Sequence, residues 1–148
     1  ALQEYRQLAD EERAFANIDR LQIEVLPLPK ELETSGLRSK KIREQVAKAC
    51  RAANITITDD ASAPKLVITS TTKVNDRHPD TVVYAIFLDL VQRTHLIRLD
   101  EELLLPTATY VLFAGKAKDK LAGAVHDSVD EGMAAVLNSI DYASKMRQ

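Results

Sequence analysis

The sequence predicts an α+β fold: a mainly antiparallel sheet of about five strands, two long helices packed on one face, and an N-terminal helix. Several segments between residues 21 and 114 carry strand signals, either alternating polarity or many β-branched residues. Residues 37–53 and 118–144 instead repeat apolar residues at helical spacing. The 148 residues suit one domain that is large enough for a real core.

Composition excludes several classes of protein. The chain is 45% hydrophobic and 28% charged, with a net charge of -2, which is typical of a globular protein and not of a disordered one. No apolar run approaches the roughly 18–20 residues of a membrane span. The single cysteine excludes an internal disulfide and a multi-cysteine metal site.

The N-terminal part is expected to be separate from the main domain in sequence. Residues 1–19 are predicted to form an amphipathic helix, and residues 20–148 a single α+β domain. Between 3 and 18, Tyr5, Leu8 and Phe15 fall on one side at helical spacing. Two interpretations stay open: a helix that packs on the domain, or a tether from a lost anchor.

The first strand and helix follow. Residues 21–28 alternate apolar and polar side chains, and the prolines after Leu26 direct the chain into a loop over 29–36. The helix over 37–53 is followed by Asn54, a residue that suits the left-handed conformation. Ser35 or Ser39 is expected to cap its start, and the sequence does not choose between them.

The next four strands are expected to be joined by hairpins. They are assigned to residues 55–59, 65–74, 81–99 and 103–114, with three consecutive hairpin links. The unit of strand, helix and strand that precedes them offers one crossover pairing. The sheet is therefore expected to be largely antiparallel.

Particular residues indicate irregularities in the long strands. A bulge or kink is expected near residues 92–94 because of the length of that strand. Pro106 has no N–H for a ladder hydrogen bond, so it indicates an edge position or a bulge. Gly115 is expected to end the strand. In the last helix, Gly132 falls inside the apolar stripe and would let the helix approach the sheet closely.

No pattern for catalysis or nucleotide binding is present in the sequence. With four glycines, no Gly-rich turn follows a strand and opens a helix, and no Gly-x-Ser-x-Gly elbow occurs. Cys50 lies in a predicted helix and is interpreted as a buried small residue, with a reactive thiol as the alternative. We therefore predict a protein that is not an enzyme and that needs no cofactor.

The sequence contains one pair of candidate metal ligands on a helix, and two ligands are too few for a zinc site. His126 and Asp130 are four residues apart on a predicted helix and face the same side, but a zinc site needs three or four ligands. His78, in a turn, and His95, on a strand, have no partner nearby in the sequence. The solvated surface of a helix is the preferred interpretation, and no metal is predicted.

One acidic residue interrupts an apolar strand. Asp89 is interpreted as a structural carboxylate that pairs with Arg93 or Arg98, or that faces solvent on the free face of the sheet. A catalytic role is the alternative, and it would require a second acid in the same cleft.

The helix over 37–53 carries a local excess of positive charge, with six basic residues and one acidic residue. Lys40, Lys41, Lys48 and Arg51 lie in one arc opposite its apolar stripe, where they form a candidate contact for an anion or a partner. Glu44 lies inside this arc and reduces its field. No aromatic residue is interleaved with these cations, so nucleic acid is an improbable partner.

The order of elements over about residues 20–142 resembles a group of small bacterial envelope proteins. It consists of an opening strand, the helix LRSKKIREQVAKACRAANI, a meander containing VVYAIFLDLVQRTHLIRL and PTATYVLFAG, and a long closing helix. This plan is similar to that of the TolB N-terminal domain and of the lipopolysaccharide-transport lipoprotein. The resemblance implies a periplasmic or envelope location and a binding or assembly role, and it transfers no site residue. No lipid-anchor cysteine stands at Ala1.

The sequence therefore predicts a non-catalytic envelope protein that binds or assembles with another macromolecule, most simply another envelope protein that adds a strand to an exposed sheet edge. The alternative is a domain that binds nucleic acid or another polyanion through the helix over 37–53. A cytoplasmic location is the alternative to the envelope.

Overall fold

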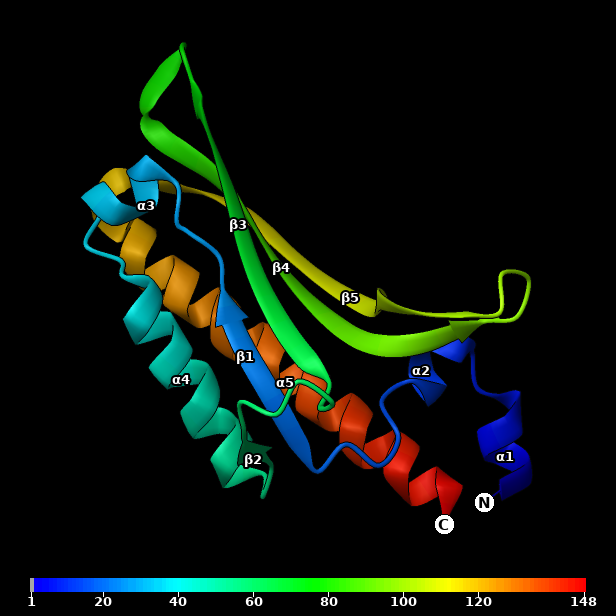
Figure 1. Cartoon of the computed structure of the whole chain (residues 1–148). Helices are drawn as coiled ribbons and strands as arrows, with labels where there is room; N and C mark the ends of the chain where they lie inside the picture. Colours follow the sequence, from blue (N-terminus) through cyan, green and yellow to red (C-terminus); the bar gives the residue numbers. More distant parts are fainter. Residues whose placement is uncertain (1) are drawn as a thin grey trace.

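The chain forms a mixed five-stranded sheet in the order β2-β1-β3-β4-β5, described here by a computed structural model for residues 2–148 (Figure 1). The strands are β1 (Arg20–Val25), β2 (Thr56–Ile57), β3 (Lys65–Asn75), β4 (His78–Leu96) and β5 (Glu101–Ala117). The helices are α1 (Leu2–Gln7), α2 (Asp10–Arg13), α3 (Lys30–Thr34), α4 (Ser39–Ala52) and α5 (Leu121–Arg147), the last preceded by a single 3-10 turn, η1 (Lys118–Lys120). The predicted α+β class is confirmed.

The sheet is antiparallel over β3, β4 and β5 but parallel around β1. The crossover pairing of β1 with β2 is present, whereas the expected hairpin between residues 55–59 and 65–74 is wrong, because β1 lies between these two strands. The link after β2 passes the start of β1, where Gln22 Nε2 donates to Ala63 O at 2.8 Å and Arg20 lies 2.7 Å from Asp60.

Asp60 stabilises the conformation of the link between β2 and β3. Its carboxylate accepts hydrogen bonds from the backbone N–H and the hydroxyl of Ser62, and from Arg20. These bonds, led by the one from the Ser62 backbone, lower the pKa of Asp60 below its ordinary value. The sequence predicted a turn at these residues. It did not predict that the link passes β1 to reach β3 on the other side.

Within residues 2–148, one helix is long. α5 has 27 residues, whereas α4 has 14, so the expectation of two long helices is not confirmed. α4 starts after Arg38, which provides no side-chain cap, so neither Ser35 nor Ser39 has the predicted capping role. Ser35 instead ends α3, a short helix in the segment expected to be a loop. Asn54 adopts the predicted left-handed conformation, with φ 61°.

The two hairpins differ from the predicted boundaries. The β3–β4 turn is shorter than the expected 75–80, since β3 ends at Asn75 and β4 begins at His78. The ladder between β4 and β5 shifts between Leu90 and Val91, close to the expected irregularity at 92–94. Pro106 lies at this shift and on an edge strand, as predicted, but β5 continues past Gly115 to Ala117.

The N-terminal segment is not one helix. α1 and α2 replace the continuous helix expected over 3–18, and Ala1 lies outside the described residues. The segment packs on the domain, because Phe15 and Ile18 join the core and Gln92 Nε2 donates to Ala14 O at 3.0 Å. Arg147, in the last turn of α5, also lies over the Tyr5 ring at 5.8 Å.

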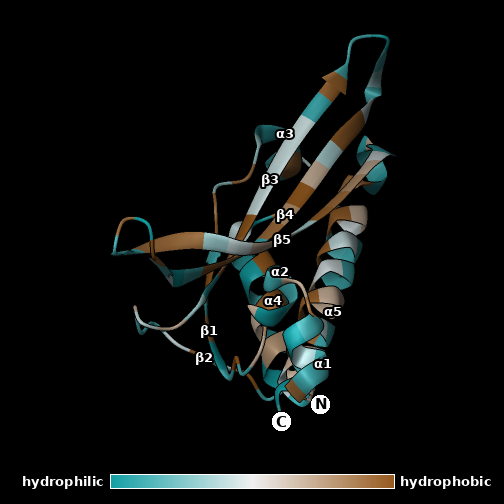
Figure 2. Ribbon diagram, turned by 90° about the vertical axis from the view of Figure 1, so that its right-hand side faces the viewer, coloured by the Kyte–Doolittle hydropathy of each residue, from teal (hydrophilic) through white to brown (hydrophobic). Residues whose placement is uncertain are grey.

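The hydrophobic core lies between the sheet and the helices. α4 and α5 lie side by side against the same face of the sheet (Figures 1 and 2). Alternate residues of β3 and β4 point into this layer, as the two-residue period of a strand requires. The fully buried side chains include Leu21, Leu32, Leu37, Ile42, Leu66, Ile68, Tyr84, Ile86, Leu88, Leu90, Leu121 and Met133.

Gly132 sets the distance between α5 and the sheet. A Cβ atom at this position would lie 2.8 Å from Leu88 Cδ1 and 2.9 Å from Leu112 Cδ1. Gly123, in the same helix, has no atom within 4 Å of the equivalent position. The predicted close approach at Gly132 is therefore confirmed.

These two glycines give a matched test. Gly123→Ala is expected to raise the free energy of unfolding by about 0.5–1 kcal/mol, because alanine favours the helix. Gly132→Ala has the same helical gain, but it overpacks Leu88 and Leu112, so it should be about 1–3 kcal/mol less stable than Gly123→Ala. Urea unfolding of both variants measures the difference; equal stabilities would contradict the close packing.

Candidate functional site

One face of the sheet is not covered by any helix of the described residues, 2–148. We call it the free face; it is formed by the side chains of β3, β4 and β5 that alternate with the buried ones. It exposes several apolar residues: Phe113 is 77% exposed, Val111 48% and Val83 46%. Val111 lies opposite Phe87, which is half-buried on the same face. In Figure 2, apolar segments extend along β4 and β5.

β5 forms a long edge of the sheet. It pairs with β4 on one side, and within residues 2–148 no strand pairs with its other side. The nine residues from Thr107 to Gly115 carry no charge and no proline. Natural edge strands are usually short, or protected by charges and prolines, because unpaired backbone groups bind other strands. The opposite edge, β2, has only two residues.

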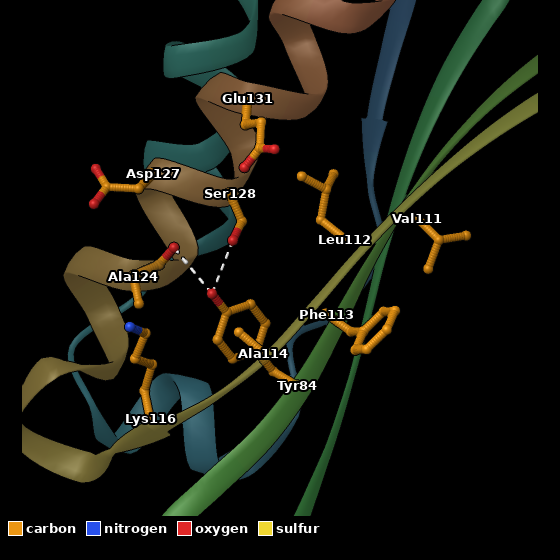
Figure 3. Close-up of a pocket in the computed structure, with 10 residues that line it drawn as sticks. All are labelled: Tyr84, Val111, Leu112, Phe113, Ala114, Lys116, Ala124, Asp127, Ser128 and Glu131. Atoms are coloured by element: carbon orange, nitrogen blue, oxygen red, sulfur yellow. Dashed lines mark hydrogen bonds between the residues drawn. The ribbon is translucent and has the colours of Figure 1, made fainter.

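A groove lies between β5 and α5 (Figure 3). It has a volume of about 440 Å³ and is lined by Leu112, Ala114 and Lys116 of β5 and by residues of α5 that include Ser128 and Glu131. Figure 3 shows the Val111 and Phe113 side chains on the far side of β5 from this groove. The edge is therefore accessible from the groove and from the free face.

Tyr84 closes the floor of the groove. Its hydroxyl donates to Ala124 O at 3.1 Å and lies 2.8 Å from Ser128 Oγ (Figure 3). The Tyr84 side chain is almost completely buried, so these bonds satisfy a hydroxyl inside the core. Ser128 is thus engaged by a phenol, and the groove lining contains no histidine that would activate it.

The His126 and Asp130 pair joins two helices. His126 Nδ1 lies 2.7 Å from Gln45 Oε1, and Gln45 Nε2 donates to His126 O at 2.8 Å and to Asp130 Oδ1 at 2.6 Å. Gln45 of α4 thus contacts both members of the pair. No cluster of three metal-ligating side chains occurs within residues 2–148. The sequence missed Gln45 because it is 81 residues from His126.

The other two histidines lie apart from this pair. His78 begins β4, opposite Asn75, and so stands at the start of a strand and not within a turn. His95 Nε2 lies 3.3 Å from Asp100 Oδ1 at the β4–β5 turn, and both side chains are exposed.

Asp89 lies on the free face. Its carboxylate accepts a hydrogen bond from the hydroxyl of Thr109, which is directly opposite on β5. In the described part of the chain, neither Arg93 nor Arg98 pairs with it. The structure therefore supports the interpretation of a solvent-facing carboxylate.

The four cations predicted as a contact site lie together on the outer side of α4. Lys40, Lys41, Lys48 and Arg51 are all exposed. Lys41 Nζ is 3.7 Å from Glu44 Oε2, while the other three make no ion pair with any of residues 2–148. This surface and the β5 edge are separate.

Cys50 is buried in α4, as preferred from the sequence. It has no exposed surface, and desolvation raises the pKa of its thiol to about 11. The interpretation of Cys50 as a reactive thiol is therefore not supported.

We expect Cys50 to react with a disulfide reagent at pH 8 only when the chain unfolds. Because the folded pKa is raised, the neutral thiol favours folding below about pH 9, and this contribution is lost as pH rises towards 11. Titration of the thiol with a disulfide reagent, with and without denaturant, measures whether Cys50 reacts only in the unfolded chain. Rapid labelling of the native protein would contradict the burial of Cys50.

No family model and no curated protein sequence matches the chain. Solved structures with a similar arrangement include a minor lipoprotein from Acinetobacter baumannii, with a TM-score of 0.44 and 13% identity over 83% of this chain and 92% of that one. The rare lipoprotein B from Shewanella oneidensis has a TM-score of 0.45 and 14% identity, over 83% and 94% of the two chains.

A third similar structure is the uncharacterized lipoprotein B from Nitrosomonas europaea. Its TM-score is 0.34 with 12% identity, over 90% of this chain and 83% of that one. All three of these solved structures are of bacterial lipoproteins. No helix within residues 2–148 has both the length and the apolar character needed to span a membrane.

Proposed function

We propose that this chain is a non-catalytic binding module of the bacterial envelope that holds another protein at the β5 edge and the adjoining free face. The observation that supports it is the open 17-residue edge of β5, whose central part has no charge and no proline. Strand addition to such an edge supplies backbone hydrogen bonds, and the side chains beside it supply specificity.

Phe113 is the central side chain of this proposal. It is 77% exposed on the free face, next to the edge, and aromatic residues contribute most strongly to protein interfaces. Val111 and Val83 extend the apolar surface around it. The groove on the other side of β5 leaves room for the side chains of an added strand that point towards α5.

Replacing Phe113 should separate binding from stability. Phe113→Asp is expected to weaken partner binding about tenfold or more, because an exposed aromatic anchor is lost and a charge is placed in the interface. The free energy of unfolding should change by no more than about 0.5 kcal/mol, since the ring is mainly in solvent. Binding assays and thermal unfolding measure the two effects.

The partner is identified by a photo-crosslinking residue at position 113 in intact cells. A protein adduct at 113, together with no adduct from the same residue at exposed Arg43 of α4, supports the proposal. Equal adducts at both positions, or no adduct at position 113, would refute the proposed binding at the β5 edge. Fractionation of the same cells tests the envelope location, and recovery in the cytoplasm would contradict it.

A second candidate function is binding of a polyanion at α4. The observation that favours it is the exposure of Lys40, Lys48 and Arg51 without ion-pair partners among residues 2–148. Glu44 lies on the same helix and pairs with Lys41, which lowers the local positive potential.

If this candidate is correct, heparin should retain the chain, and retention should fall steeply with salt. The double variant Lys40→Glu and Lys48→Glu should then elute early, whereas Lys118→Glu with Lys120→Glu, which changes the net charge equally, should not. Unchanged retention of the first variant would rule out the polyanion function.

A further inference from the structure

We propose that the occupant of the β5 edge is the β5 strand of a second copy of this chain, paired antiparallel about a two-fold axis at Thr109. This inference rests on the proposed function, because it uses the same edge. It names the partner and the register.

The charges of β5 favour this partner. The strand begins with Glu101 and Glu102, and it ends with Lys116 shortly before Lys118 of η1. In an antiparallel pair of identical strands, the acidic start of each copy lies beside the basic end of the other. Glu101, Lys116 and Lys118 have no ion-pair partner among the described residues, so their charges remain available.

The shift in the ladder determines the register. Leu90 pairs with Ala108, and Val91 pairs with Pro106, so Thr107 is an extra residue in β5. Because of this extra residue, the free face carries odd-numbered residues after Thr107 and even-numbered residues before it. They are Thr109, Val111 and Phe113 on one side, and Pro106 and Leu104 on the other.

We place the two-fold axis at Thr109 and leave Thr107 of each copy unpaired. In this register, residues that lie opposite each other in the two copies are on the same face of the sheet. Counting outward, Val111 lies opposite Pro106 of the second copy, Phe113 opposite Leu104, and Lys116 opposite Glu101. Each pair has both members on one face of the sheet, as antiparallel pairing requires. This register therefore keeps opposite side chains on one face of the sheet and also places Lys116 of each copy beside Glu101 of the other.

This register also covers the apolar side chains that the single chain exposes. Phe113 is 77% exposed and Leu104 61%, and the two-fold axis brings them together twice. The paired segment from Glu101 to Lys116 would extend for about 50 Å at the rise of a β-strand. Two sheets would then form one continuous sheet, with the helices of both copies on the same face.

Other charged groups lie near both ends. His95 and Asp100 pair at the β4–β5 turn, and Arg93 of β4 lies opposite Leu104. Asp127 and Glu131 of α5 line the groove beside Lys116. None of these groups is on the edge strand between Glu101 and Lys116, so the pairing of the two strands depends on the charges of β5 itself.

Charge reversal tests the register. Glu101→Lys places lysine against Lys116 in both contacts, and Lys116→Glu places glutamate against Glu101; each should weaken dimerisation about tenfold. The two variants mixed together should form a heterodimer, and the double variant should regain the wild-type dissociation constant. Arg43→Glu on α4 is the matched control, and sedimentation velocity measures the dissociation constant.

A cysteine at the axis provides an independent test. Thr109→Cys should form a disulfide-linked dimer under mild oxidation, because opposite Cα atoms in an antiparallel pair are about 4.5–5.5 Å apart, within the range of a disulfide. Thr71→Cys, exposed on the same face but on β3, should not cross-link. Buried Cys50 should not interfere.

Several outcomes would overturn the inference. They are a monomeric wild-type chain at high micromolar concentration, charge reversals that behave like Arg43→Glu, or cross-linking through Thr71→Cys and not Thr109→Cys. If the chain is monomeric but the crosslinker at 113 captures a different protein, the proposed function stands and the second copy is refuted. If position 113 captures nothing, both fail.

Discussion

Burial of the apolar stripe of α5 against the inner face of β4 and β5 is the contact on which the rest of the structure depends. Gly132 allows this contact by bringing the helix backbone close to Leu88 and Leu112. Since the helices form a single layer, they cover one face of the sheet. The free face stays open as a direct consequence, whereas the β5 edge is open because β5 is the last strand in the order of the sheet.

The two edges of the sheet are not equivalent. The crossover through α4 returns the chain to the outer side of β1, where β2 adds only two residues before the chain turns away. That edge is too short to accept a long strand. The meander on the other side ends in β5, which has 17 residues and an uncharged centre. The asymmetry concentrates potential strand binding on one side of the molecule.

Several polar groups have structural partners within residues 2–148. Gln45 joins His126 and Asp130 between the two main helices, the Tyr84 hydroxyl is bonded to α5, and Thr109 donates to Asp89. The raised pKa of Cys50 follows from its burial. The bonds of Gln45 join the two main helices, and those of Tyr84 join the sheet to α5.

Local pattern in the sequence determined the fold class, the long last helix, the meander, the left-handed Asn54, the close approach at Gly132 and the edge position of Pro106. Each of these follows from the conformational limits or periodicity of nearby residues. The position of β1 between β2 and β3, and the bridge from Gln45 to His126, depend on residues that are far apart in the chain. Among the two proposed binding surfaces, the cations of α4 are visible from helical spacing alone. Phe113, Val111 and Leu104 become a surface only after packing has assigned one face of each strand to the core, because alternation does not say which face the helices will cover.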